Sequence, residues 1–441
     1  RAIRSKQISS VEVVRAHLEH IHTVNPRLNA VVFATAESAI KEARTADRHN
    51  KRKNVLGPLH GVPFTAKDIF NTAGLPTTAG LRMLRTNVPD HDATVVARMR
   101  RAGAILIGKT NCPPGGMGSD SWNPLHGGTR NPYDVNRSPG GSSSGEAAII
   151  AAGGSPLGIG SDSGGSIRMP ASYCGIAALK PTAGMVPVTG AYGLPGGISD
   201  PRSQVGPMAR YVSDLVLTLP VLIGPDGVDS GVVPVPLPKR TPQLPGLKVA
   251  WYADDGLMKP TPAVAAAVRA AAKALSAAGC VVTEERLPGL SEAEQVTLGY
   301  WGRKHMSHER LYRRWDAFRT SVLTFMSTFD LVLSPVAPDV APLYRARSTP
   351  DHQYTYTIPY SLSGNPCVVV RAGTSAENMP IGVQVVARSW NDLVALRAAR
   401  AIERALGGWR PASVIGRSSA TRGGMEPRSV MSSTPGTCST R

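Results

Sequence analysis

The chain has 441 residues, a length that suits one large α/β domain or two to three smaller ones. Hydrophobic residues make up 42% and charged residues 18%, a balance that is ordinary for a globular protein and argues against wholesale disorder. No uninterrupted apolar stretch reaches the roughly 18–20 residues of a membrane span.

The formal net charge is +18, which invites a nucleic-acid-binding interpretation. Residues 1–53 carry eleven Lys and Arg against five Asp and Glu, and residues 409–441 carry five Arg against one Glu. The two ends therefore hold +6 and +4 of the charge, and the long middle holds only +8. No basic strip interleaved with aromatic residues accompanies them. We expect a solvated basic surface and no nucleic-acid partner.

The cysteines are odd in number and scattered, with no C-x-x-C pair. They are Cys112, Cys174, Cys280, Cys367 and Cys438. This pattern favours reduced thiols over a disulfide or metal framework, and with it a cytoplasmic protein. The chain opens at Arg1 without a methionine, which suggests an incomplete N-terminus and leaves a signal peptide open.

The first half of the chain predicts helices that alternate with short apolar strands. Ser9 and Glu12 form a capping box at the first helix, which we expect Asn25-Pro26 to close. The predicted elements are helices at residues 9–22 and 35–47, a loop holding residues 51–53, a helix at 92–102, a strand at 104–107, a helix at 143–152 and a strand at 156–159. This alternation indicates an α/β domain covered on both faces of its sheet.

The second half begins with a crossover at about residues 224–246, which contains six prolines. The next helix has Thr261 as N-cap, Pro262 in its first turn and Gly279 past its end. The predicted elements are a strand at 248–252, a helix at 262–278, strands at 331–333, 367–371 and 382–386, and a helix at 392–406. Residues 414–441 lack hydrophobic periodicity and are predicted to be a disordered tail.

Two segments are rich in glycine and serine. Residues 138–146 read SPGGSSSGE and run into a predicted helix, and residues 160–168 read GSDSGGSIR and follow a predicted strand. Either could cradle a phosphate, although neither matches a P-loop or a G-x-G-x-x-G motif. Structural turns are the other alternative. Runs of small residues offer no side chains for the core to pack, so stability alone does not explain them. We favour the interpretation that the backbone of these segments approaches a ligand closely.

A third segment, residues 61–68, reads GVPFTAKD and places Lys67 just after a short apolar strand. A lone lysine there is most often a surface residue whose stem lies along apolar neighbours. Considered with the two serine segments, a lysine held in a polar pocket is the better interpretation.

These three segments together resemble the amidase signature family, and most closely its fatty-acid-amide-hydrolase-like branch. Ser142 follows Lys67 by 75 residues, and Ser166 follows Ser142 by 24. Residues 129–132, 174–182, 204–208 and 380–384 also resemble family segments. The resemblance extends to about residue 412 and implies one domain over residues 1–413. Its implied fold is α/β, with α/β/α layers around a large twisted mixed β-sheet and neither metal nor organic cofactor.

The resemblance implies a Ser–Ser–Lys triad. Ser166 is then the nucleophile that forms an acyl-enzyme, and Ser142, which follows a cis peptide bond in the family, relays its proton to Lys67. A lysine that accepts a proton must be neutral, so its pKa should lie near ~7–8 instead of ~10.4. Desolvation and limited negative charge nearby can produce that shift.

The family also assigns roles to glycines beside the triad. The backbone N–H groups around Ser163, Gly164, Gly165 and Ser166 would form an oxyanion hole. Gly116 and Met117 lie in a loop, residues 113–118, that would border the acyl pocket. This loop is richer in glycine than the usual family version, which favours a wider or more mobile entrance.

Other side chains near the triad admit two interpretations. Asp162 and Arg168 are predicted to pair with each other and to tie down the nucleophile loop. Ser143 either caps the following helix or hydrogen-bonds within the triad network. Cys174 is expected to be a buried thiol. His60, beside the Gly-Val-Pro strand, keeps a conventional Ser–His–Asp triad open as a rival.

The middle of the chain departs from the family pattern. Ser203 stands where many members of the family have Asp. The segment of residues 289–329 is shorter than the corresponding segment in many members. Four aromatic residues there either line the substrate site or form a helical core face: Tyr300, Trp301, Tyr312 and Trp315. The triad is intact in spite of these differences, and the substrate is left in doubt.

Three hypotheses follow for function. The first is an amidase acting on small-molecule amides, with possible ester and carbamate (urethane) cleavage, and with a homodimer left open. The second is the catalytic subunit of a tRNA-dependent amidotransferase, which needs further protein partners. The third is a basic nucleic-acid-binding protein, whose binding would fall steeply with salt and survive Ser166→Ala.

Overall fold

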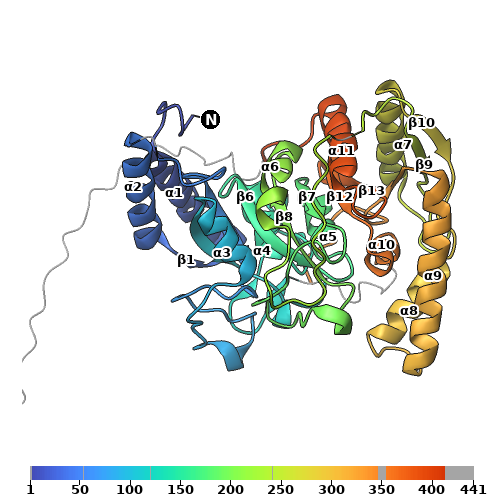
Figure 1. Cartoon of the computed structure of the whole chain (residues 1–441), viewed down its shortest axis with the longest axis horizontal. Helices are drawn as coiled ribbons and strands as arrows, with labels where there is room; N and C mark the ends of the chain where they lie inside the picture. Colours follow the sequence, from blue (N-terminus) through green and yellow to red (C-terminus); the bar gives the residue numbers. More distant parts are fainter. Residues whose placement is uncertain (1, 53, 120, 241, 346–353, 413–441) are drawn as a thin grey trace, which may run out of the picture.

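The computed structural model (Figure 1) describes residues 2–52, 54–119, 121–240, 242–345 and 354–412. Its centre is an 11-stranded mixed sheet in the order β1-β3-β2-β6-β8-β7-β12-β13-β11-β9-β10. The strands are β1 Val31–Ala34, β2 Pro63–Lys67, β3 Ile105–Thr110, β6 Leu157–Asp162, β7 Ala177–Lys180, β8 Gln204–Ala209, β9 Lys248–Trp251, β10 Val281–Glu284, β11 Leu331–Pro335, β12 Cys367–Thr374 and β13 Pro380–Ala387. A short hairpin, β4 Trp122–Asn123 with β5 Gly127–Gly128, lies outside it.

Helices cover both faces of this sheet. They are α1 Ser10–Leu28, α2 Ala36–Lys51, α3 Thr94–Arg101, α4 Ser144–Ala151, α5 Arg168–Tyr173, α6 Val212–Leu222, α7 Pro262–Ala277, α8 Leu290–Tyr300, α9 His308–Thr328, α10 Ile358–Ser363 and α11 Asp392–Leu406. Single 3-10 turns occur at η1 Arg82–Leu84, η2 Pro114–Gly116 and η3 Gly197–Ser199.

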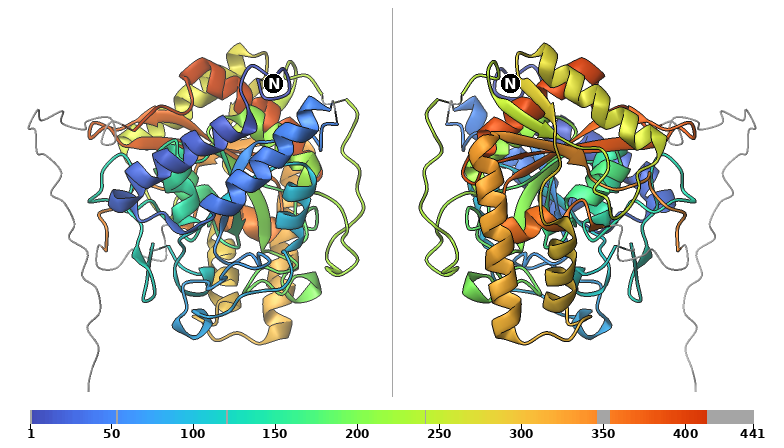
Figure 2. Two further views of the ribbon diagram at one scale, coloured as in Figure 1. Left: turned by 90° about the vertical axis from the view of Figure 1, so that its left-hand side faces the viewer. Right: turned by 90° about the vertical axis from the view of Figure 1, so that its right-hand side faces the viewer.

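The buried apolar side chains form two clusters, one for each face. Helices α3, α6, α7 and α11 supply one cluster, and the other contains residues from α1, α2, α4, α5, α8, α9 and α10. Figure 2 shows this separation, with α7 and α11 on the opposite side of the sheet from α8 and α9. The predicted α/β/α arrangement around a large mixed sheet is confirmed.

Helix ends with clear capping residues match their predictions. The capping box of Ser9 and Glu12 is present, and Thr261 caps α7 through its side chain. Helix α11 begins and ends at the predicted residues. The first strands and helices of the chain agree within a few residues, because their apolar patterns are continuous.

Two predicted boundaries are wrong. Helix α1 continues through Pro26 to Leu28, because the Asn29 N–H bonds to the Asn25 carbonyl and the last turn loses only the one donor that proline lacks. Helix α2 includes Lys51, which was expected in the loop, since the Arg52 N–H still bonds within the helix.

The proline-rich crossover lies between α6 and β9, and the single-domain assignment stays a prediction. The predicted tail at residues 414–441 lies outside the described residues, as does Cys438. The other four cysteines are free and buried, as expected. Within the described ranges, no helix is long and apolar enough to cross a membrane.

Candidate active site

Lys67 is the last residue of β2 and its side chain is fully buried. Its Nζ lies 2.6 Å from Ser142 Oγ and 2.9 Å from Ser161 Oγ, and a longer contact of 3.4 Å reaches the Gly116 carbonyl. Strands β2 and β6 run side by side in parallel, so their carboxyl ends meet at one edge of the sheet. This pairing brings Lys67 beside Ser161, whereas Ser142 comes from the loop before α4.

Ser166 lies in the short loop after β6, and its backbone contacts that of Ser143. The Ser143 N–H donates to the Ser166 carbonyl at 3.1 Å, which ties the two serine-rich segments together through their backbones. The Gly141–Ser142 peptide bond is cis. Ser142 is buried and Ser166 is half-buried.

Asp162 and Arg168 clamp the loop that carries Ser166. The two side chains are fully buried and form an ion pair of 3.0 Å. Burial opposes ionisation of Asp162, but the Arg168 guanidinium and backbone donors lower its pKa to about 2. Asp162 accepts hydrogen bonds from the N–H groups of Gly165, Ile167 and Arg168, at 2.8, 3.1 and 3.3 Å. The carboxylate therefore fixes the backbone on both sides of Ser166.

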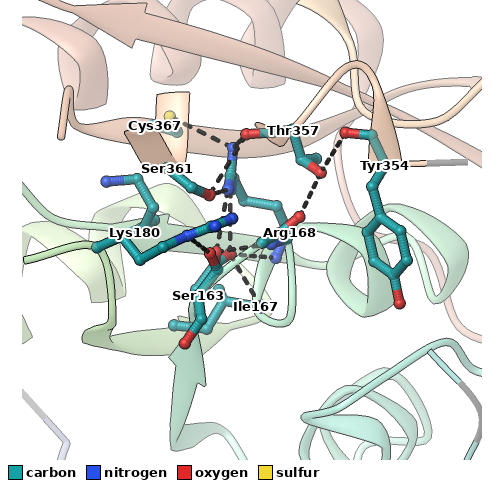
Figure 3. Close-up of polar contacts among 12 residues, drawn as sticks. Ser163, Ile167, Arg168, Lys180, Tyr354, Thr357, Ser361 and Cys367 are labelled. Atoms are coloured by element: carbon teal, nitrogen blue, oxygen red, sulfur yellow. Dashed lines mark hydrogen bonds and ion pairs between the residues drawn. The ribbon is translucent and has the colours of Figure 1, made fainter. Parts of the chain in front are cut away.

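The outer end of Arg168 is held by residues from the far end of the chain. Its Nη1 donates to the Thr357 carbonyl at 2.8 Å and its Nη2 donates to Ser361 Oγ at 2.7 Å. Figure 3 shows Arg168 at the centre of these contacts, with Cys367 above it. The Thr357 hydroxyl also donates to the Gly164 carbonyl at 2.6 Å. Helix α10 and the turn before it thus set the position of the loop that carries Ser166.

Two glycines of this loop have no room for a side chain. Gly165 adopts φ of 130°, and a Cβ there would lie 2.6 Å from Thr357 Oγ1. A Cβ on Gly164 would lie 2.9 Å from the ring of Trp301. Both positions require glycine, one for its backbone conformation and both for space.

Burial lowers the pKa of Lys67 to about 8. Glu146, at the start of α4, is also fully buried, and burial raises its pKa to about 8. Its two oxygens accept hydrogen bonds from Thr65 Oγ1 at 2.7 Å and Thr110 Oγ1 at 2.9 Å. The Lys67 amine can thus be neutral near physiological pH, and its partners are the hydroxyls of Ser142 and Ser161.

Comparison with known proteins agrees with this geometry. The family named Amidase matches residues 12–313 and 302–396. An acylamidase from Rhodococcus erythropolis is 32% identical over 91% of this chain and 93% of its own length. The chain belongs to the amidase signature family.

Other members of the family are about equally similar to this amidase. A glutamyl-tRNA(Gln) amidotransferase component from Chloroflexus aggregans is 33% identical over 91% of this chain and 94% of its own length. A solved structure of fatty acid amide hydrolase has a TM-score of 0.83 at 26% identity and covers 92% of this chain and 84% of that chain. This amidase is accordingly a hydrolase of carbon–nitrogen bonds.

The predicted site residues do not all lie at the lysine. The Gly116 carbonyl contacts Lys67, but the side chain of Met117 is 72% exposed. Ser143 makes no side-chain cap of α4, and its hydroxyl instead exchanges 3.3 Å contacts with the backbone of Ser161. His60 accepts a hydrogen bond from the Leu56 N–H, and within the described ranges no hydrogen bond joins it to Ser142 or Ser166.

The aromatic residues of the middle region divide between the two interpretations. Trp315 is a buried core residue that contacts the rings of Tyr300 and Tyr312. Trp301, at the end of α8, lies against Gly164 of the nucleophile loop. The Ser203 hydroxyl is hydrogen-bonded to that of Ser163 in the same loop.

Several residues that shape the site were not among the predicted site residues. Ser161 lies in the serine- and glycine-rich segment of residues 160–168. Side chains of a strand alternate between its two faces, and this alternation next to Asp162 could have placed Ser161 beside Lys67. Thr357 and Arg202 have no recognisable signal, because their contacts depend on chain segments far away in the sequence. In the described part of the chain, no group of His, Cys, Asp and Glu side chains is placed to hold a metal ion.

Proposed function

We propose that this amidase hydrolyses small-molecule amides with Ser166 as nucleophile, Ser142 as proton relay and Lys67 as base. The observation that carries the proposal is the 2.6 Å contact between a fully buried lysine amine and the Ser142 hydroxyl. A neutral Lys67 accepts the proton of Ser142, which in turn takes the proton of Ser166. Ser166 Oγ then attacks the carbonyl carbon of the substrate.

The tetrahedral intermediate carries a negative oxygen that needs donors. We assign this role to the backbone N–H groups of Ser163, Gly164 and Ser166. Gly165 was expected among them, but its N–H already donates to Asp162, so Gly165 contributes its backbone conformation and lack of a side chain instead. Gly116 and Met117 are proposed to border the substrate, with Ser143, Asp162 and Arg168 as positioning residues.

Collapse of the intermediate breaks the carbon–nitrogen bond. The proton taken up by Lys67 returns through Ser142 to the leaving amine, and the acyl group stays on Ser166. Water then attacks the acyl-enzyme with the same base, which releases the acid and restores the serine. An ester or a carbamate presents the same carbonyl to Ser166, so both are proposed as further substrates.

Initial rates on a matched aryl amide, ester and carbamate that share one acyl size would test this mechanism. We expect Ser166→Ala and Lys67→Ala to lose at least about a thousandfold in kcat while their unfolding transitions remain cooperative. Ser144→Ala is the matched control, because its buried hydroxyl has no hydrogen-bond partner. A Lys67→Ala enzyme that cleaves amides at the native rate would rule out the assigned base.

The amidotransferase is a second candidate, since one component of such an enzyme is 33% identical to this chain. That function predicts glutamine hydrolysis that appears only when partner proteins and tRNA are added. Turnover of aryl amides by the isolated chain, with no stimulation by those additions, would decide for the stand-alone amidase.

A further inference from the structure

Arg202 is a buried guanidinium whose outer nitrogens have no hydrogen-bond partner. Its side chain has no exposed surface. Its Nε donates to the Ser163 carbonyl at 2.8 Å, which fixes the group beside the nucleophile loop. Nη1 and Nη2 are both buried and unpartnered. An orphaned pair of charged donors inside a protein is costly and therefore calls for a specific explanation.

Neighbouring groups do not supply the missing partner. Asp200 lies nearby, but its Oδ1 accepts from the Tyr300 hydroxyl and the Ser203 N–H, both at 3.2 Å. No ion pair involves Arg202 in the described ranges of the chain. Aromatic rings surround it instead, with its Cζ 4.9 Å from the ring centre of Tyr300 and 5.3 Å from that of Trp301.

The orphaned nitrogens are close to the reacting groups. A Cβ on Gly164 would lie 3.7 Å from Arg202 Nη2, and Gly164 is two residues before Ser166. The same Cβ would touch Trp301, so the indole ring and the guanidinium meet over the loop that is proposed to hold the oxyanion. Arg202 therefore lies beside the loop that carries Ser166.

We propose that Arg202 recognises a carboxylate on the substrate, next to the bond that is cleaved. A guanidinium offers two parallel N–H donors on Nη1 and Nη2, which match the two oxygens of a carboxylate. Such a ligand would satisfy both orphaned nitrogens and neutralise the buried charge at once. Burial lowers the pKa of Arg202 to about 10, in spite of the nearby Tyr300 and Asp200, so the group stays cationic at neutral pH. This inference rests on the proposed function and names the class of its substrate.

Two pairs of anilides test the assignment. The first pair compares a half-anilide of succinic or glutaric acid with its methyl ester, and the second compares an N-acyl 4-aminobenzoate with the uncharged N-acyl anilide. In each pair only one member carries a carboxylate, on the acyl side in the first pair and on the amine side in the second. We expect the wild type to prefer the acid of one pair by at least about tenfold in kcat/KM.

The variants are Arg202→Met, Arg202→Lys and a matched control, Arg303→Met. Arg303 is exposed and lies over the same Trp301 ring at 5.0 Å, so its loss tests general electrostatic attraction. We expect Arg202→Met to lose about a hundredfold more in kcat/KM on the preferred acid than on its uncharged partner, mainly through KM on the acid. Arg202→Lys should recover only part of the preference, and Arg303→Met should retain it.

Retention of the preference in Arg202→Met, or its absence from the wild type in both pairs, would overturn the assignment. Turnover of the uncharged anilides by the wild type reports separately on the proposed function, because it requires Ser166 and no carboxylate on the substrate. If no anilide is cleaved, calorimetric titration of Ser166→Ala with glutarate still decides the matter. Binding that disappears in the Ser166→Ala, Arg202→Met double variant supports the carboxylate site, and equal or absent binding in both contradicts it.

Discussion

The pH dependence of turnover tests the role of Lys67 most directly. Its pKa of about 8 means that about a tenth of the molecules hold the neutral amine at pH 7. On an uncharged substrate, kcat/KM should therefore rise roughly fiftyfold between pH 6 and pH 8 and level off above about pH 9. Lysine at its ordinary pKa of 10.5 would instead give a rate that still rises tenfold per pH unit at pH 9.

Glu146 complicates this test, because its pKa also lies near 8. Two buried groups that interact titrate as a pair, so a midpoint in the wild type cannot be given to either one alone. The substitution Glu146→Gln separates them. It keeps the size of the side chain, and the hydroxyls of Thr65 and Thr110 can still hydrogen-bond to an amide.

The rate profile can be assigned to titration of Lys67 or of Glu146, and these two assignments predict opposite results for Glu146→Gln. An ionised Glu146 favours the protonated form of Lys67, so its removal should lower the midpoint of the rate profile, by on the order of one pH unit, and leave a single one-proton step. Loss of the pH dependence together with the activity would refute the lysine base and make Glu146 the titrating group. Circular dichroism across the same pH range controls for unfolding.

Three further variants probe the scaffold around the triad. Gly165→Ala should fold but lose at least about a hundredfold in kcat, measured on the aryl amide, because φ of 130° and Thr357 Oγ1 at 2.6 Å leave no place for the new methyl group. Asp162→Asn leaves the buried Arg168 cation unpaired and should cost about 3–5 kcal/mol in urea unfolding, and a loss below about 1 kcal/mol would contradict the clamp. Lys67→Met should raise the thermal midpoint at pH 7. A lysine pKa lowered from 10.5 to about 8 costs the folded wild type about 3 kcal/mol, and the variant is relieved of this cost. The loss of the hydrogen bonds to Ser142 and Ser161 offsets part of the gain. Wild-type stability should recover as the pH rises from 8 towards 10.5, so the difference between the two proteins should narrow over that window, and a constant difference would argue against the lowered pKa.

Local signals in the sequence predicted the elements that have local causes. Helix α7 begins where Thr261 offers a cap, and α11 matches its predicted bounds because its apolar face is continuous. Pro26 misled the prediction of α1, since proline near the end of a helix removes a single hydrogen bond that the last turn can spare. The order of the strands in the sheet was beyond such signals, because β8 separates β6 from β7 in space but follows both in sequence.

The candidate site was predicted as three motifs, and the structure adds what holds them together. Lys67, Ser142 and Ser166 stand in segments whose glycines and serines are visible in the sequence. Thr357 donates to the Gly164 carbonyl across 193 residues, and no pattern around it marks that role. Contacts of this kind follow from the pairing of distant strands and cannot be inferred from composition or periodicity.

Lys67 can act as a base only if no carboxylate forms an ion pair with it, because an opposite charge within about 4–6 Å stabilises the protonated amine. Two acidic residues near the lysine have cations of their own. Asp162 pairs with Arg168 at 3.0 Å, and Asp68, the neighbour of Lys67 in sequence, pairs with Lys109 at 3.2 Å. Within the described ranges, no carboxylate is within ion-pair distance of the Lys67 amine, whose closest partners are hydroxyls.

Glu146 is the remaining acid near Lys67. Burial raises its pKa, whereas the pKa of Asp162 is lowered by its ion pair with Arg168. Glu146 has no cation, so desolvation keeps it protonated up to about pH 8, and the hydroxyls of Thr65 and Thr110 hold its oxygens. The same low-polarity interior therefore keeps Glu146 uncharged at neutral pH and lowers the pKa of Lys67 to about 8. An isosteric amide at position 146 should leave this arrangement intact, whereas Glu146→Lys would place a second buried amine beside the base and should abolish cooperative unfolding.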